Sequence, residues 1–278
     1  MIIDFHTHTF PEKIASSAIA KMQSDSHSAS FTSGTQKALI DSMRKSGIDY
    51  SVVLPVITNP VKDSHINSIS TEQNGKDGLI YFGGIHPDSE NIREKLKYLA
   101  SNGIKGIKIH PVYQGADIDD IRFLNILSLA GELGLTVITH SGDDIGFPGV
   151  VRCSPKMLIN AVKQVGNVRL VAAHMGGWKN WDEVYALAEM PSVFIDTAFS
   201  LGKITPIDNH YSAEELKLLD NENFLKIIRI FGSKRVLFGT DSPWDCQKTA
   251  KELILKLPLS NEEKDDIFYN NARTILGI

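Results

Sequence analysis

Short apolar runs recur along the chain and alternate with longer amphipathic stretches. The runs are nearly continuous in valine, isoleucine and leucine, as in SVVLPVI over 51–57, which is typical of strands covered on both faces. The expected strands span 1–8, 50–56, 79–85, 104–110, 135–140, 168–174, 193–198 and 235–240. The stretches between them predict helices over 35–46, 63–73, 89–101, 119–133, 154–165, 180–189, 213–231 and 261–275.

Local signals support several of these helices. Asp119 begins a run with apolar residues at helical spacing, which ends at Gly134, and Ser154-Pro155 is typical of a capping residue followed by proline in the first turn. Eight strand–helix pairs favour a single (β/α)₈ TIM barrel over residues 1–278. A doubly wound parallel sheet is the structural alternative, but it would spread the strand ends along a line instead of a ring.

Two segments exceed the minimal strand–helix pattern. Residues 9–34 form a long first loop with a short helix and a serine-rich stretch, and residues 199–212 form a loop after the seventh strand. Loops longer than about 12–15 residues are usually functional or mobile. We expect both to border the active face as lids or pocket walls, while a disordered surface loop is the alternative for 24–34.

Composition and charge exclude several classes of function. The chain has 278 residues, a net charge of −4 and 42% hydrophobic residues, so it lacks the basic surface expected for nucleic acid or anionic membrane. No apolar stretch approaches the roughly 20 residues of a membrane span. Two cysteines make no disulfide framework, and a strand that starts at residue 1 leaves no room for a signal peptide. These features predict a cytoplasmic protein.

Chemically active side chains stand where the apolar runs end. Six of the nine histidines, one lysine and one aspartate do so, in MIIDFHTH (1–8), YFGGIHP (81–87), IKGIKIHP (104–111), TVITHSG (136–142), RLVAAHMGG (169–177) and VLFGTDSP (236–243). The carboxyl ends of barrel strands meet on one face, which is where TIM-barrel active sites lie. The pattern therefore predicts a metal-dependent catalytic site at that face.

His6 and His8 form the first part of this site. Residues two apart on a strand face the same side, so both imidazoles can bind one cation, with Asp4 on the same face one layer deeper. His140, His174 and Asp241 end later strands, and a carboxylate buried at a strand end is costly unless it binds metal or is hydrogen-bonded. Three histidines and one carboxylate suit Zn²⁺ or a neighbouring divalent metal with one position open for water.

These motifs together resemble the amidohydrolase superfamily. The resemblance rests on Asp-x-His-x-His in the first strand, histidines ending the fifth and sixth, and Gly-Thr-Asp-Ser-Pro at the eighth. The GTDSPW turn, the segment over 86–111 and the ending YNNARTILGI are similar to the amidohydrolase-2 branch, which contains aminocarboxymuconate-semialdehyde decarboxylase and related aromatic-acid decarboxylases. The resemblance spans essentially the whole chain and identifies fold and metal site better than reaction.

The resemblance implies a set of roles. His6, His8, His140 and Asp241 would hold one divalent metal, expected to be Zn²⁺ with Mn²⁺ as an alternative. His174 would be the neighbouring acid/base or electrostatic residue, and Asp241 could also accept a proton from metal-activated water. A homodimer is expected on the same ground.

Lys108 decides between one metal and two. In binuclear members of the superfamily a lysine in this setting is carbamylated and bridges two metals, whereas in the amidohydrolase-2 branch Lys108 would stay an ammonium paired with Asp241 or a substrate carboxylate. A buried lysine without a chemical role is a further alternative. We expect the mononuclear arrangement, with His86 and His110 lining the pocket without binding metal.

Further candidates surround the expected site. Asp196 could orient a ligand histidine, and Arg152 could pair with an acidic substrate, although a solvated surface arginine is the simpler interpretation. Five aromatic residues follow strand ends and could form a wall for a planar substrate: Tyr113, Phe147, Trp178, Phe199 and Trp244.

We expect hydrolysis of a small-molecule amide, ester or lactone, with His174, Asp241 and Lys108 as the catalytic side chains. Non-oxidative decarboxylation of a small aromatic or unsaturated acid on the same metal site is the main alternative. A catalytically silent metal-binding barrel is a third interpretation.

Overall fold

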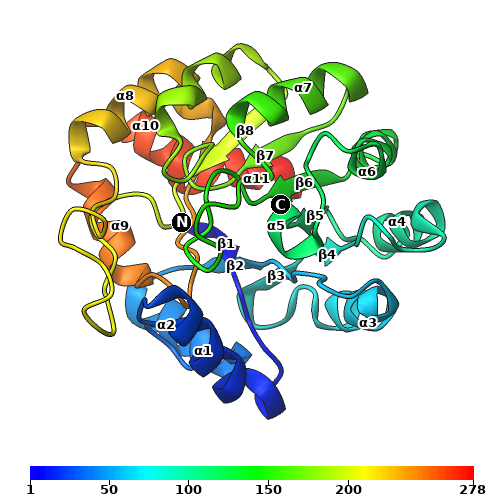
Figure 1. Ribbon diagram of the computed structural model, residues 1–278, viewed down its shortest axis with the longest axis horizontal. Helices are drawn as coiled ribbons and strands as arrows, with labels where there is room; N and C mark the ends of the chain where they lie inside the picture. Colours follow the sequence, from blue (N-terminus) through cyan, green and yellow to red (C-terminus); the bar gives the residue numbers. More distant parts are fainter.

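Parallel strands at the centre of the molecule are surrounded by helices in the computed structural model, which describes residues 1–278 (Figure 1). One sheet has the order β1-β2-β3 and the other the order β4-β5-β6-β7-β8-β9. The strands are β1 (Ile3–Thr7), β2 (Tyr50–Val53), β3 (Leu79–Tyr81), β4 (Gly83–Gly84), β5 (Gly106–Ile109), β6 (Thr136–Thr139), β7 (Leu170–Ala172), β8 (Val193–Asp196) and β9 (Val236–Leu237).

Backbone hydrogen bonds join the two sheets into a barrel. On one side Phe5 N donates to Phe238 O at 2.7 Å and His8 N donates to Ser242 O at 2.7 Å. On the other side Phe82 N donates to Val53 O at 3.0 Å, next to the break between β3 and β4. The predicted (β/α)₈ barrel is therefore confirmed, and the expected third strand is interrupted at Phe82.

Most predicted helices have close counterparts. They are α2 (Gln36–Ser46), α3 (Asp63–Gln73), α4 (Ile92–Ser101), α6 (Ile121–Glu132), α7 (Pro155–Val165), the 3₁₀ helix η3 (Trp181–Glu189) and α8 (Asn221–Phe231). Ser154 caps α7 by accepting a hydrogen bond from Met157 N, as its sequence predicted. Asp220 caps α8, so this helix begins eight residues later than the expected 213.

Four helical segments differ from the expectation. The first loop holds α1 (Glu12–Ser26), which is longer than the short helix expected there. The predicted helix over 261–275 is divided into α10 (Asn261–Asp265), the π-helical η5 (Asp266–Asn270) and α11 (Asn271–Leu276). Two helices were not predicted from the sequence. They are α9 (Gln247–Leu255), which starts after Cys246 without a side-chain cap, and the single turn α5 (Pro111–Gln114).

The core has two layers, as expected for a barrel. The larger cluster lies between strands and outer helices, and includes Ile107, Phe123 and Leu158. In the smaller cluster Phe5 and Phe82 pack edge to face with ring centroids 5.7 Å apart, and α11 residues join them. The C-terminal helix thus packs against the first strand and leaves the other barrel end free for the cavity.

The two long loops meet at the rim of the barrel. Ala29 N donates to Thr205 O at 2.8 Å, Ile207 N donates to His27 O at 3.2 Å, and Ser28 forms an antiparallel bridge with Pro206. The expectation that both loops border the active face is supported because Ser26, Ser28 and Phe199 line the main cavity. None of the helices is long and apolar enough to span a membrane.

Candidate metal centre

Three predicted ligands converge at the open end of the barrel. His6 Nε2 and His8 Nε2, both from β1, are 3.2 Å apart. Asp241 Oδ1, which follows β9, lies 3.4 Å from His6 Nε2 and 3.1 Å from His8 Nε2. These separations are close to the spacing between ligand atoms that share one small cation, since the metal lies about 2.0–2.2 Å from each.

The second nitrogen of each imidazole is already committed to an acceptor. His6 Nδ1 donates to Asp196 Oδ2 at 2.8 Å, and His8 Nδ1 donates to the Leu54 carbonyl at 2.7 Å. Both Nε2 atoms therefore present lone pairs toward each other, which is unfavourable until a cation or proton lies between them. The side chains present fit a divalent metal, and Asp196 takes the orienting role predicted for it.

The register of β1 explains how this face is formed. Its pairing with β2 shifts between Asp4 and Thr7, so simple alternation does not hold along the strand. Asp4 accepts hydrogen bonds from Thr240 Oγ1 at 2.6 Å and Gln247 Nε2 at 2.8 Å, and it does not line the cavity. The expectation that Asp4 shares the face of His6 and His8 is therefore wrong.

Asp241 and His174 both hold left-handed backbone conformations. Their φ angles are 65° and 61°, which are uncommon outside glycine and often mark functional sites. Burial raises the pKa of Asp241, but the hydrogen bond with His8 and the surrounding imidazoles outweigh it and hold the pKa well below its usual range. Asp241 is therefore an anion, as a ligand carboxylate must be.

His174 stands beside the converging ligands as a neutral imidazole. Its Nδ1 donates to the Ala198 carbonyl at 3.0 Å, and its ring centroid lies 5.1 Å from that of His6. Burial lowers the pKa of His174 to about 3. The carbonyl fixes the tautomer, so Nε2 is left as a proton acceptor.

His140 lies farther from His6 and His8 than its predicted role implied. Its Nε2 donates to the Asp143 carbonyl at 2.8 Å, and its ring centroid is 4.8 Å from that of His174. The group of close ligand atoms holds His6, His8 and Asp241, whereas His140 belongs to a second group with His110 and Asp144. Nδ1 of His140 keeps its lone pair.

The second group is unsuited to a metal despite its composition. Asp144 Oδ2 lies 3.3 Å from His110 Nε2 and 4.0 Å from His140 Nε2. The His110 and His140 rings are stacked, with centroids 4.4 Å apart and planes 11° apart, so a cation between them would lie outside both ring planes. Imidazole lone pairs lie in the ring plane, so this group is better described as a hydrogen-bonded pair with a stacked neighbour.

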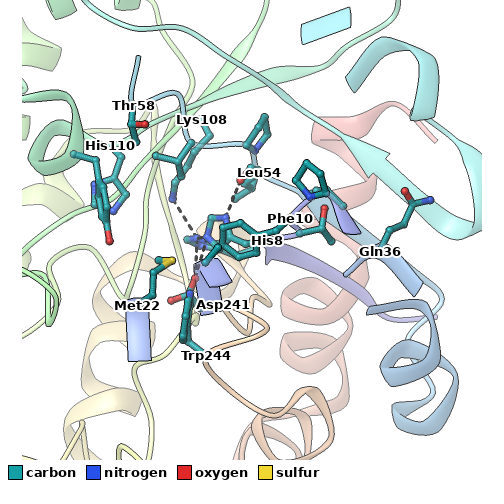
Figure 2. A pocket seen from close by; sticks show the side chains of 18 of the residues that line it. His8, Phe10, Met22, Gln36, Leu54, Thr58, Lys108, His110, Asp241 and Trp244 are labelled. Atoms are coloured by element: carbon teal, nitrogen blue, oxygen red, sulfur yellow. Dashed lines mark hydrogen bonds and ion pairs between the residues drawn. The ribbon is translucent and has the colours of Figure 1, made fainter. Parts of the chain in front are cut away.

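Lys108 points into the ligand cluster. Its Nζ lies 3.1 Å from His6 Nε2, and the side chain is buried without a salt bridge (Figure 2). Burial lowers the pKa of Lys108 to about 8, although Asp196 and Asp241 partly oppose that effect. The expected direct pairing with Asp241 is absent from the structure, and the Lys108 ammonium donates instead to His6 Nε2.

A cavity of about 1150 Å³ opens above these residues. Figure 2 shows His8, Lys108 and Asp241 between His110 on one side and Phe10 and Gln36 on the other. Four of the five predicted aromatic residues line it, while Phe147 instead packs edge-on against Tyr113 with centroids 4.8 Å apart. His110 lines the cavity as expected, but His86 does not.

Other residues correct or extend the sequence-based site. Arg152 forms an ion pair with Asp117 at 3.0 Å and does not line the cavity. Phe10, Met22 and Asp144 line it without having been singled out. Asp144 lies on an irregular loop after β6, and its only sequence signal was its place four residues after a strand-end histidine.

Comparison with known proteins agrees with this description. The family described as amidohydrolase matches residues 3–278, and no curated protein sequence matches the chain. An uncharacterised TIM-barrel protein from Bordetella bronchiseptica is similar at 16% identity and TM-score 0.75, covering 99% of this chain and 98% of that one. A protein from Pseudomonas putida described as a candidate 2-pyrone-4,6-dicarboxylic acid hydrolase has 17% identity, a TM-score of 0.66, and coverage of 99% and 97%. The 5-carboxyvanillate decarboxylase of Novosphingobium aromaticivorans, a mutant with bound manganese, has 16% identity, a TM-score of 0.67, and coverage of 100% and 97%.

Proposed function

The chain belongs to the amidohydrolase family, and from that premise we propose that it is a metal-dependent hydrolase of a small amide, ester or lactone. The observation that carries the proposal is the convergence of His6 Nε2, His8 Nε2 and Asp241 Oδ1 in an open cavity. A structural metal site is usually closed off by its protein ligands, whereas this group borders a cavity of about 1150 Å³ that can keep a coordination position open for water or substrate.

The charges at the inner end of the cavity would be balanced once a divalent metal is bound. Asp143, Asp144 and Asp241 border its inner end, where Lys108 is the cation. Arg152 is occupied elsewhere by Asp117. The three carboxylates, one ammonium and a divalent cation sum to zero, so a neutral amide, ester or lactone needs no counter-charge from the protein there.

The chain's own residues have distinct roles in this proposal. A divalent metal supplies Lewis-acid polarisation and lowers the pKa of water from 15.7 to about 7. Asp241 and the neutral His174 Nε2 are the proton acceptors beside it, and His174 would return the proton to the leaving group. Asp196 positions His6, while Trp178, Phe199 and Trp244 exclude water from one side of the substrate.

We propose His140 as a fourth ligand, through Nδ1. The hydrogen bond from His140 Nε2 to the Asp143 carbonyl supports this because it leaves Nδ1 free. Zn²⁺ is the metal best matched to imidazole and carboxylate ligands, and Mn²⁺ is the alternative. Lys108 remains an ammonium that attracts a substrate oxygen. The homodimer and the cytoplasmic location stay predictions.

Decarboxylation is the second candidate, because solved structures with the same fold include decarboxylases of 2,6-dihydroxybenzoate and 5-carboxyvanillate. In that reaction the carbon–carbon bond breaks, CO₂ leaves, and a protonated side chain would deliver a proton to the carbon that keeps the electron pair. Lys108 is the ammonium placed for this role.

A single panel of test substrates distinguishes hydrolysis from decarboxylation. The metal-loaded protein would be incubated with aryl esters, lactones and anilides, and separately with hydroxybenzoates and muconate-like acids, with product and CO₂ both measured. Hydrolysis that is abolished by chelator and restored by metal supports the proposal. Release of CO₂ without any hydrolytic product overturns it, and no turnover of either panel by a metal-loaded protein favours the silent barrel.

A further inference from the structure

The main cavity does not end at the ligand cluster. It continues outward between α2 and α3, so that Gln36, Ile40 and Arg44 of α2 line the same cavity as His6 and His8. Figure 2 shows Phe10 between His8 and Gln36, at the junction of the two parts. We call the outer part the α2–α3 arm.

The arm exists because α2 and α3 pack on different neighbours. α2 packs on α9, whereas α3 packs on β3, β4 and α4. The two helices therefore stand apart around the barrel, with β2 between them (Figure 1). Tyr81, whose hydroxyl donates to Gln36 Oε1 at 3.3 Å, links the barrel to α2 across this space.

The amphipathic pattern of α3 is inverted. The helix buries Asp63, Asn67 and Ser70 and turns Ile66 and Ile69 toward the arm, where Ile69 is 38% exposed. A surface helix normally buries its apolar stripe against the core. Ile66 is half-buried and Ile69 exposed, so the two offer an apolar strip to an occupant of the arm, beside charged side chains of α2 such as Lys37, Asp41 and Arg44.

Two of the buried polar residues of α3, Asp63 and Asn67, make specific contacts that hold the helix in this orientation. Asn67 Nδ2 donates to the Gly84 carbonyl at 2.9 Å, and Gly84 N donates back to Asn67 Oδ1 at 2.9 Å. Asp63 pairs with Lys95 at 2.9 Å. Rotating α3 to bury its isoleucines would break these contacts and leave buried polar groups unpaired.

The length of the arm follows from helix geometry. Gln36, Ile40 and Arg44 are spaced at i, i+4 and i+8, which spans about 12 Å at 1.5 Å per residue. Ile66, Ile69 and Gln73 span about 10 Å on the facing helix. The arm thus has the length of a medium alkyl chain or an arylalkyl group.

We propose that the α2–α3 arm binds the apolar chain of the substrate, which makes the preferred substrate an ester, amide or lactone of a medium-chain or arylalkyl acid. This inference rests on the proposed hydrolytic site. Because the arm is continuous with the ligand cluster, we assign it to the substrate and not to a partner protein.

Hydroxamic acids test the arm by binding alone, without turnover. Acetohydroxamate and octanohydroxamate would be titrated into the metal-loaded protein by calorimetry. We expect octanohydroxamate to bind at least ~10-fold more tightly, because each fully buried methylene contributes about 0.8 kcal/mol, roughly fourfold in affinity. Equal affinities, or no binding of either compound, overturn the proposal.

A pair of matched variants locates the effect. Ile69→Arg should abolish the advantage of the octanoyl chain and leave acetohydroxamate binding unchanged. Ile230→Arg, on α8 outside the cavity and 42% exposed, should change neither. An advantage that survives Ile69→Arg, or a change confined to oligomeric state, overturns the proposal in favour of a second copy or partner on this groove. A chain-length effect on binding without ester hydrolysis would instead reject the hydrolase reaction and keep the arm.

Discussion

Two groups of histidine and aspartate lie side by side in this cavity, yet only one is arranged to hold a metal. In the first, the rings of His6 and His8 cross at 71° and their Nε2 lone pairs converge 3.2 Å apart. In the second, the His110 and His140 rings are stacked within 11°. The same residue types thus give a ligand set in one place and a hydrogen-bonded stack in the other. The difference is that Nδ1 of both His6 and His8 is anchored by an acceptor, whereas Nδ1 of His110 is buried without a partner.

The largest effect expected is loss of the first group. His8→Ala should remove bound metal and lower kcat/KM on the order of 1000-fold, because the metal supplies several kcal/mol of transition-state stabilisation. Metal content and turnover measure this. His86→Ala is the matched control, since His86 also ends a strand but does not line the cavity. Full metal content in His8→Ala would show that the group of His6, His8 and Asp241 does not hold the metal, which would contradict the distinction between the two groups.

His174→Gln should lower kcat by about 10²–10⁴-fold while metal content stays at the wild-type level, because His174 moves protons without binding metal. The acidic limb of the pH–rate profile should also change, because His174 acts as a neutral base that protonation at low pH would disable. Loss of metal in this variant would make His174 a ligand, and an unchanged rate would remove it from catalysis.

Asp196→Asn should weaken metal binding by about 10–100-fold, since the carboxylate anchors His6 Nδ1 at 2.8 Å. Competition with a chelator measures the affinity. Asp245→Asn is the control, as it removes a half-buried carboxylate that accepts a hydrogen bond from Cys246 N instead of from a histidine. If both variants bind metal as tightly as the wild type, Asp196 has no role in orienting the ligand.

Asp144→Asn should leave metal content unchanged and lower the free energy of unfolding by about 2 kcal/mol, because the charged acceptor of His110 is lost. Urea denaturation of the metal-free protein measures this. Asp144→Asn losing metal while its stability is preserved would show that the second group is the true ligand set.

The smallest expected effect is a pH dependence from His110, whose pKa burial lowers to about 3. The folded pKa lies below that of the unfolded chain, about 6.5, so the stabilisation is complete above pH 6.5 and is lost as pH falls toward 3. At pH 5.5 the loss is about 1.4 kcal/mol relative to pH 7.5. His110→Gln, denatured without metal at both pH values, should show a difference smaller by that amount. An equal difference in both proteins would contradict the buried, neutral state of His110.

The barrel was predictable because its strands are near-continuous apolar runs and its helices carry local signals, such as Ser154 before α7. The same logic placed His6, His8 and Asp241 together, since all three end strands of one barrel. The prediction failed at positions whose structure is not encoded in the local pattern of apolar and polar residues. The irregular register of β1 redirects Asp4, and the loop that carries Asp144 has no periodicity. The separation of His140 from the first group depends on ring orientation, which spacing along the chain does not encode.

Anomalous X-ray scattering at the metal absorption edge, on crystals of the metal-loaded protein, tests the central claim most directly. A single peak bounded by His6 Nε2, His8 Nε2 and Asp241, with His140 Nδ1 as the proposed fourth ligand and Lys108 unmodified, is the predicted result. A peak between His110 and Asp144, or a second peak bridged by a modified Lys108, would contradict it.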